Sequence, residues 1–226
     1  MKYVIVFLFL NLVSLTNLVF AQQANKDLEV KRLTINIIGA ANFANLLGKH
    51  YSNVNGNIET ITKNYTPFFG GTIGFSCDYS LTKKLSLQTA LIYTTIGANL
   101  LQKTTIYSEF DRIEYKKTYA YSLSYLKIPL IVNYYPSPKF YISGGLYMAY
   151  NTFYTIKQDK LTSKLPKLEG VNPIDLGVIV AVGVVKSNFS YGVRYSYGLT
   201  KAISNDKESL HNSVFQLVFS IVIMKY

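Results

Sequence analysis

The chain is poor in the residues on which many exported domains and enzymes depend. It has one cysteine, no tryptophan and two histidines in 226 residues. A single cysteine excludes a framework of internal disulfides, and the apolar strand residues around Cys77 predict a small buried or lipid-facing side chain rather than a reactive thiol. There is no metal-ligand spacing, no phosphate-binding glycine loop and no paired-carboxylate pattern. We therefore expect neither a metal nor a cofactor.

Acidic residues are scarce too. Twelve Asp and Glu stand against 23 Lys and Arg, which gives a formal charge of +11. Basic proteins are attracted to nucleic acids and to anionic surfaces. An exported chain rarely meets nucleic acid, so we expect a membrane surface rich in phosphorylated glycolipid instead. The expected partners are outer-membrane lipid and lipopolysaccharide, with no nucleic acid.

Residues 1–21 predict a cleaved signal peptide. Lys2 is the single basic residue before an almost uncharged apolar run, Tyr3 to Phe20, and small or apolar residues, Val19 and Ala21, stand at positions −3 and −1 of the expected cleavage site. The alternative is a retained membrane anchor, which the polar residues within the run disfavour. No cysteine follows the expected cut, so a lipoprotein anchor is not indicated.

The rest of the chain predicts one domain. Residues 22–32 contain several charges and are expected to form a periplasmic leader. Residues 33–226 are enough for one barrel or sandwich but few for two domains. We expect this segment to be a single outer-membrane β-barrel domain, for the reasons that follow.

The stretch from Asn172 to Thr200 alternates strictly between two kinds of residue. Large apolar side chains occupy every second position, and the positions between them hold mostly Gly, Ala and Ser, with Asp175 and Arg194. Successive side chains of a strand point to opposite faces, so each run predicts a strand with one apolar face. Only Lys186–Asn188 separate the runs, which indicates a tight antiparallel hairpin.

The small and polar face of these strands decides the fold class. In a soluble sandwich the large apolar residues point inward, and long charged residues cover the outer face. Glycine, alanine and serine suit a crowded interior better. A transmembrane barrel inverts the soluble pattern, with an apolar outer band and a polar or small-residue lumen. The 20 Tyr and 13 Phe are also typical of the aromatic girdles of such barrels.

Similar alternation predicts eight strands in all, joined by connections that are long and short in turn. Bacterial barrels place short turns in the periplasm and long loops outside, and they have an even number of strands. We therefore predict an all-β, eight-stranded antiparallel up-and-down barrel that crosses the bacterial outer membrane several times. The four expected outer loops are Asn45–Asn64, Asn99–Lys117, Asn151–Val171 and Lys201–His211.

Three short segments resemble a known family. Tyr125-Leu126-Lys127-Ile128-Pro129-Leu130 resembles the Tyr-Leu-x-Ile-Pro-Leu strand of the PorT-like outer-membrane β-barrel proteins of the Bacteroidetes. Gly192–Thr200 is similar to that group's Gly-x-Arg-Tyr-x-x-Gly-Leu-x segment, and Val214–Leu217 resembles the opening of its last strand. The resemblance implies an outer-membrane barrel and, for most members, no established activity. The name-giving member is tied to a protein secretion system.

The last strand departs from the usual pattern of outer-membrane barrels. Assembly machinery usually reads a terminal aromatic on the same face as the other outward residues. Here Tyr226 has the opposite parity from Phe215 to Ile223, and Lys225 takes the expected position. Either a β-bulge or a different terminal register is expected near the end of the strand. Pro129 likewise predicts a bulge or an unpaired position, because proline cannot donate a ladder hydrogen bond.

Four charged residues on the inward face are the candidate site: Asp78, Lys127, Asp175 and Arg194. Buried charges are costly unless they are paired, so we expect an ionic and hydrogen-bonded network across a narrow lumen. Eight strands enclose a space that side chains can just fill. We therefore predict a plugged lumen, with a small-solute pore as the alternative.

Two histidines leave an enzymatic alternative open. His50 and His211 fall in expected outer loops, near Ser52, Ser209 and Glu208. Serine, carboxylate and histidine at the outer rim are what a lipid-modifying hydrolase of the lipid A deacylase kind would need. No motif supports that arrangement, and solvated loop histidines explain it as well. We expect no catalytic residues and no enzyme activity.

The function that fits these features is a non-enzymatic outer-membrane barrel. We expect it to act structurally or through interactions of its extracellular loops. An accessory role in protein secretion, with secretion-system or cell-envelope proteins as partners, is the finer possibility that the resemblance suggests. A soluble, lipocalin-like ligand carrier is the remaining alternative.

Overall fold

A computed structural model describes residues 33–50, 54–55, 59–107, 112–158, 161–165, 171–205 and 208–226. The predicted signal peptide and leader, residues 1–32, lie outside the described residues. The described part contains no helix with the length and apolar character needed to cross a membrane.

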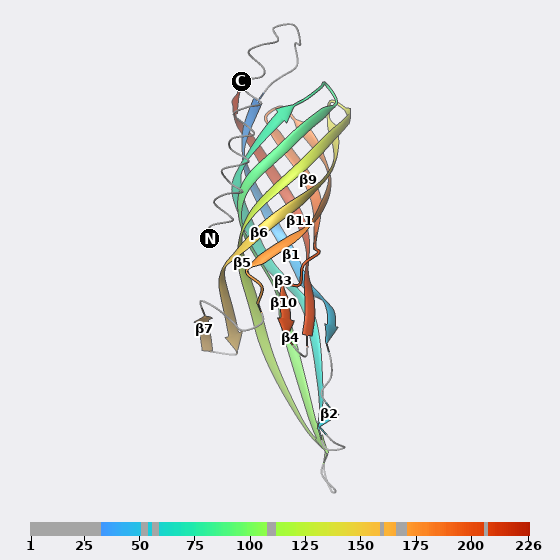
Figure 1. The fold of residues 1–226 in the computed structure, drawn as a ribbon, viewed down its shortest axis with the longest axis vertical. Coiled ribbons are helices and arrows are strands. Elements are labelled where there is room, and N and C mark those ends of the chain that lie inside the picture. Colours follow the sequence, from blue (N-terminus) through green and yellow to red (C-terminus); the bar gives the residue numbers. More distant parts are fainter. Residues whose placement is uncertain are drawn as a thin grey trace.

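Eight long strands form a closed antiparallel ring (Figure 1). Consecutive long strands are hydrogen-bonded neighbours, and β1 pairs with both β11 and β3, which closes the ring. The long strands are β1 (Leu33–His50), β3 (Glu59–Ser80), β4 (Leu85–Tyr107), β5 (Arg112–Ser137), β6 (Phe140–Gln158), β8 (Ile174–Lys186), β9 (Phe189–Gly198) and β11 (Glu208–Lys225). Three short strands, β2 (Val54–Asn55), β7 (Leu161–Leu165) and β10 (Ile203–Asn205), extend the sheet beside β3, β6 and β11.

The two faces of the ring confirm the inverted pattern. Along β8, Leu176, Val180 and Val182 are exposed, whereas Asp175, Gly177 and Ala181 at the alternate positions are buried. The other long strands also expose large apolar side chains, among them Phe69, Ile73, Phe75, Leu146 and Leu217. Hydrocarbon is the solvent in which such an outer surface is stable. The polar and small residues therefore line the interior of the barrel.

The ends of the barrel differ. At the turn end the strands are joined by short turns, and Leu33 and Tyr226 exchange backbone hydrogen bonds of 2.9 and 3.1 Å. The β8–β9 turn consists of Ser187 and Asn188, and Ser187 has a φ of 58°. The long connections meet at the opposite, loop end.

The expected outer loops are shorter than predicted. Strands continue into the expected loop Asn45–Asn64 as far as His50 on one side and from Glu59 on the other. They also continue into the loops predicted at Asn99–Lys117, Asn151–Val171 and Lys201–His211. The prediction placed strand ends where the apolar alternation stops, but ladder hydrogen bonds need no apolar side chains. The strands therefore extend beyond the apolar band.

Three of these extensions form an arm at the loop end. We define the arm as residues 59–64 of β3, 101–107 of β4 and 112–118 of β5, which pair with one another in continuous register. β1 leaves β3 at Phe68, and β6 begins to pair with β5 only at Tyr119. Figure 1 shows β4 and β5 running past the other long strands toward the lower end of the view. The arm is thus a three-stranded sheet that projects from the ring.

The strand register explains the two positions where irregularities were predicted, the end of the last strand and Pro129. β11 contains a bulge at Ile223, because Val222 pairs with Asn36 while Met224 pairs with Ile35. The extra residue restores the usual phase: Lys225 lines the interior, and Tyr226 is exposed with its hydroxyl 3.4 Å from the Met224 sulfur. Pro129 is locally unpaired with β4, but the register on either side of it does not shift. Its carbonyl accepts a hydrogen bond from the Thr89 hydroxyl at 3.1 Å.

Candidate functional site: the barrel interior

A polar layer crosses the middle of the barrel. The Asn42 amide donates to the Thr94 hydroxyl at 3.0 Å, and the Thr72 hydroxyl donates to Asn42 Oδ1 at 2.9 Å. Gln216 adds bonds to Asn42 Oδ1 at 2.7 Å and to Thr72 Oγ1 at 3.1 Å. All four side chains are buried and come from β1, β3, β4 and β11. A buried network whose members are satisfied fixes the relative positions of the strands that supply it.

The second polar group is centred on Tyr147. The Lys127 ammonium lies 3.7 Å from the centre of the Tyr147 ring and donates a hydrogen bond of 3.1 Å to Ser196 Oγ. The Tyr147 hydroxyl donates to Asp175 Oδ2 at 3.0 Å. The ring therefore stands between the cation and the carboxylate, which interact electrostatically without direct contact.

Asp175 takes two further hydrogen bonds. The Asn212 amide donates to its Oδ2 at 2.8 Å, and the Thr200 hydroxyl donates to its Oδ1 at 3.0 Å. The same Asn212 amide reaches the Tyr125 hydroxyl at 3.2 Å. Asp175 is 2% exposed, so these donors replace the water that a carboxylate would otherwise hold. We call Lys127, Tyr147, Asp175, Asn212 and Thr200 the Tyr147 cluster.

Apolar side chains fill the loop-end half of the interior. Leu123, Leu210 and Ala98 have no exposed surface, and they belong to one continuous buried cluster. Its other members include Leu46, Ile96, Tyr125, Ile179, Ala202, Ile203 and Val214. The space left beside the Tyr147 cluster amounts to about 10 Å³, roughly the room for one water molecule. The interior is therefore closed by packed side chains on its way to the loop end.

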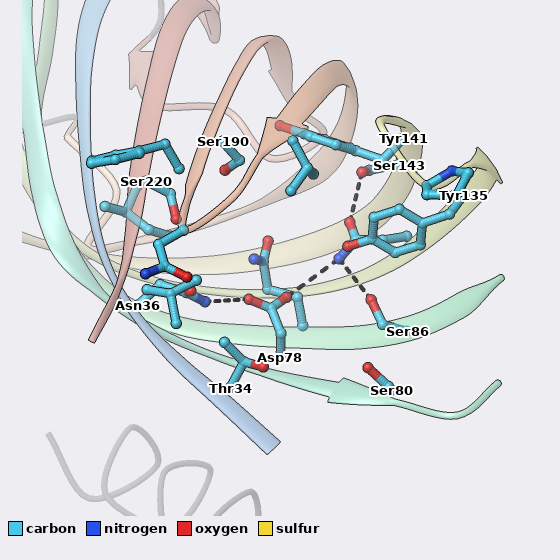
Figure 2. Close-up of a pocket in the computed structure, with 18 of the residues that line it drawn as sticks. Thr34, Asn36, Asp78, Ser80, Ser86, Tyr135, Tyr141, Ser143, Ser190 and Ser220 are labelled. Carbon is cyan, nitrogen blue, oxygen red and sulfur yellow. Dashed lines mark hydrogen bonds between the residues drawn. The ribbon is translucent and has the colours of Figure 1, made fainter. Parts of the chain in front are cut away.

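The turn-end half of the interior is hollow. A cavity of about 410 Å³ is lined by residues from every long strand and by the turn residues Thr82, Lys83, Pro138, Ser187 and Asn188. Figure 2 shows several of its hydroxyl groups, from Thr34, Ser86, Ser143, Ser190 and Ser220, around this space. We call it the turn-end cavity.

Asp78 lies on the wall of the turn-end cavity, where side-chain amides hold it. Asn36 donates from Nδ2 to Asp78 and also to Ser76 Oγ, and the Asn133 amide lies 3.4 Å from Asp78 Oδ1 (Figure 2). Asn133 also donates to Ser86 Oγ at 3.2 Å and accepts from the Ser143 hydroxyl at 2.6 Å. The donors around the Asp78 carboxyl group are therefore neutral amides.

Arg194 lines the same cavity from β9. It is 8% exposed, and its buried Nε has no hydrogen-bond partner among the described residues. Asp78 and Tyr141 line the same cavity as the guanidinium.

The four charges predicted as one network thus lie at two separate places inside the barrel. Lys127 and Asp175 belong to the Tyr147 cluster, whereas Asp78 and Arg194 face the turn-end cavity. In the described part of the chain no hydrogen bond joins any two of the four. The amide and phenol donors that connect them to the interior were not singled out from the sequence. Tyr147 could have been, because it is a large aromatic on the small-residue face of its strand, between Gly145 and Ala149.

The two histidines lie on strands rather than in the predicted loops. His50 is the last residue of β1, and its backbone pairs with Glu208. His211 belongs to β11: its Nδ1 is 2.9 Å from the Gly198 carbonyl oxygen, and its ring stacks on Tyr197 with 5.9 Å between centroids. Among the described residues no three His, Cys, Asp or Glu side chains are grouped so that they could hold a metal ion.

A closed antiparallel ring with an apolar outer surface and a polar interior defines a transmembrane β-barrel. The model of the family described as outer membrane protein beta-barrel domain matches residues 20–204. The chain belongs to this family, and its place is the bacterial outer membrane.

Solved outer-membrane barrels are similar over most of the chain. Neisserial surface protein A is 16% identical, with 83% of this chain and 96% of that chain covered and a TM-score of 0.46. Ail of Yersinia pestis, in complex with a heparin analogue, is 10% identical, with 87% and 99% covered and a TM-score of 0.42. OprG of Pseudomonas aeruginosa is 13% identical, with 88% and 99% covered and a TM-score of 0.37. No curated protein sequence matches the chain.

Proposed function

We propose that this protein is a non-catalytic, non-conducting outer-membrane barrel that binds a partner through its projecting arm. The observation that carries the proposal is the arm itself. Three strands continue in register well beyond the ring, although a barrel that only spans the membrane needs strands of roughly 9 to 11 residues. The strands that form the arm have 22, 23 and 26 residues.

The chemistry of the arm suits an anionic or strand-adding partner. Its segments carry more basic than acidic residues, with Lys63, Lys103, Arg112, Lys116 and Lys117 against Glu59 and Glu114. Within the described residues the β3 edge of the arm is paired only at Glu59 and Thr60, by β2. An unpaired strand edge is a template for an added strand. The segments similar to the PorT-like group support the finer proposal that this partner is a secretion-system or cell-envelope protein.

A photo-crosslinking amino acid at Lys117, in the arm, tests the proposal in intact cells. We expect one or a few discrete crosslinked protein bands, because Lys117 is exposed beyond the ring. The same amino acid at Leu146, an exposed wall position of β6, is the matched control and should crosslink mainly to lipid. Equal protein crosslinking at both sites, or none at Lys117, would refute an arm-specific partner. If the identified partner belongs to a secretion machine, deleting the arm should also reduce the exported proteins.

The closed interior supports the absence of a pore. We expect the purified barrel to insert into planar lipid bilayers without a steady conductance, because the apolar cluster around Leu123 and Leu210 blocks the route to the loop end. Brief flickering would reflect transient opening of packed side chains. A large, steady channel in most insertions would contradict this proposal and restore the small-solute pore.

The contacts of His211 favour a structural role over hydrolysis. Its ring is held by Tyr197 and by the Gly198 carbonyl, so one ring nitrogen is already engaged. A general base needs a nucleophile within hydrogen-bonding reach. If the barrel is non-catalytic, His50→Ala and His211→Ala should leave the masses of lipid A the same as in cells with the natural protein.

A further inference from the structure

We propose that the turn-end cavity is a binding site for a small oxyanion, a phosphate or a carboxylate, with Arg194 as its anchor. This inference concerns the half of the barrel that opens toward the periplasm. It is independent of the arm and its partner, so either proposal can fail while the other holds.

The first argument is the state of the Arg194 guanidinium. The side chain is more than nine-tenths buried, and its Nε lacks a partner among the described residues. Leaving a buried donor unpaired costs about 1 to 3 kcal/mol, and more for a charged group. A guanidinium presents five N–H donors in one plane and suits the paired oxygens of a carboxylate or phosphate. An oxyanion in the cavity would compensate the charge of the guanidinium and accept from those of its N–H groups that face the cavity.

The second argument is that neighbouring groups are already engaged elsewhere. Gln216, which pairs with Arg194 across the strands, gives its amide to Asn42 and Thr72. Ser196, two residues along β9, accepts from Lys127. Asp78 is held by the amides of Asn36 and Asn133. The Asp78 carboxylate, which lines the same cavity as Arg194, is therefore positioned by other donors, and the guanidinium is left for a ligand.

The third argument is the shape and lining of the cavity. A volume of about 410 Å³ falls within the range of small-molecule sites. Tyr141 lies against Gly183 and Gly192, and a Cβ at Gly192 would come within 2.6 Å of the Tyr141 hydroxyl. The two glycines thus make room for this phenol, which lines the cavity together with Ser190 and Arg194.

Charge at the entrance favours the same class of ligand. Lys83 and Lys225 line the mouth of the cavity, and Lys225 is held by a 3.0 Å hydrogen bond from its Nζ to Asn188 Oδ1. Cationic groups around a narrow opening raise the local concentration of anions. Asp78, which lines the same cavity near the turn end of β3, would disfavour ligands whose negative charge extends to its side. The site therefore suits a small anion with its charge concentrated at one end.

NMR spectroscopy of the refolded full-length barrel tests this inference directly. Arg32, Arg112 and Arg194 are the arginines of the chain, so the Arg194 Nε–H signal can be assigned by its loss in Arg194→Lys. Inorganic phosphate, acetate and dihexanoyl phosphatidylglycerol are titrated separately in a phosphate-free detergent. We expect a saturable shift of the Arg194 signal with at least one of them, and only slight, non-saturating shifts of the other two arginine signals.

Two variants complete the test. Arg194→Lys keeps the charge but loses the planar fork, so calorimetry should show an affinity weaker by about tenfold or more. Lys186→Gln removes a positive charge from the same end of the barrel but outside the cavity lining, and its affinity should change less than about twofold.

The three probes also distinguish the source of the anion. Tighter binding of the short-chain lipid than of phosphate would identify a phospholipid headgroup, whereas tighter binding of phosphate or acetate would identify a soluble anion. No saturable shift with any probe, or equal shifts of all three arginine signals, would overturn the proposal. The titration of the unsubstituted protein decides this even if Arg194→Lys does not fold.

Discussion

Replacing Asp175 with Ala is expected to destabilise the barrel by about 3 to 5 kcal/mol, the usual effect of removing one partner of a buried charge pair. The carboxylate is almost completely buried and accepts hydrogen bonds from Tyr147, Asn212 and Thr200. Its loss removes the acceptor that Tyr147, Asn212 and Thr200 share and leaves Lys127 without a compensating negative charge. Urea unfolding of the barrel in lipid vesicles, followed by tyrosine fluorescence, measures the change.

A double-mutant cycle separates the charge effect from the hydrogen bonds. Asp175→Asn keeps the shape and one acceptor oxygen, and Lys127→Met keeps the length of the side chain without its charge. If the two charges compensate each other across the Tyr147 ring, the double variant should be more stable than the sum of the single effects predicts, by about 1 to 3 kcal/mol. Strict additivity would show that Lys127 and Asp175 are independent and that the cluster is held by hydrogen bonds alone.

The fold could be predicted from the sequence because the pattern has a period of two. In a strand this period assigns each residue to a face without any knowledge of its neighbours. Val180 and Val182 are exposed, and Ala181 between them is buried, as the alternation predicted. The same reasoning was less informative at the loop end. There the alternation of apolar and polar residues stops, but the hydrogen-bonded ladder of β4 and β5 continues.

The contacts inside the barrel were less predictable for a geometric reason. Parity places Lys127 and Asp175 in the lumen, but the stagger of the strands around the ring decides whether they meet. β5 and β8 are separated by β6, and the residue that β6 places between the two charges is Tyr147. Its ring fits because Gly177 faces it: a Cβ there would lie 2.5 Å from the ring carbons. The network therefore depends on a three-strand arrangement that no single segment reveals.

The bulge at Ile223 shows how one inserted residue changes the interpretation of a sequence pattern. By parity alone Lys225 should point to the lipid and Tyr226 into the barrel. The extra residue reverses both, so that the terminal aromatic faces outward and the lysine reaches the mouth of the turn-end cavity. When the outward-facing residues change parity once, at the end of a strand, a bulge is thus a better explanation than a different fold.

Adjacent glycines of β6 provide the sharpest test of the close contact between strands. Gly145→Ala is expected to destabilise the barrel by about 1 to 3 kcal/mol or more, because a Cβ at this position would collide with the Leu130 carbonyl and lie 2.7 Å from the Ile131 Cα of β5. Backbone atoms of a paired strand cannot move aside as a flexible side chain can. Heat-dependent gel mobility and urea midpoints measure the loss.

Gly144→Ala is the matched control, since it makes the same change one residue earlier on the opposite face. A Cβ at Gly144 meets no atom within 4 Å, so the substitution should be neutral or should stabilise the barrel by about 0.4 to 1 kcal/mol through a less flexible unfolded chain. Gly70 and Gly71 repeat the comparison on β3, where a Cβ at Gly70 would collide with the Thr95 carbonyl and one at Gly71 would not collide with any atom. Equal effects within each pair would mean that β5 and β6, or β3 and β4, are not packed as closely as the ring requires. Opposite effects within both pairs would establish that the narrow interior, and with it the sealed route to the loop end, depends on glycine at the inward position.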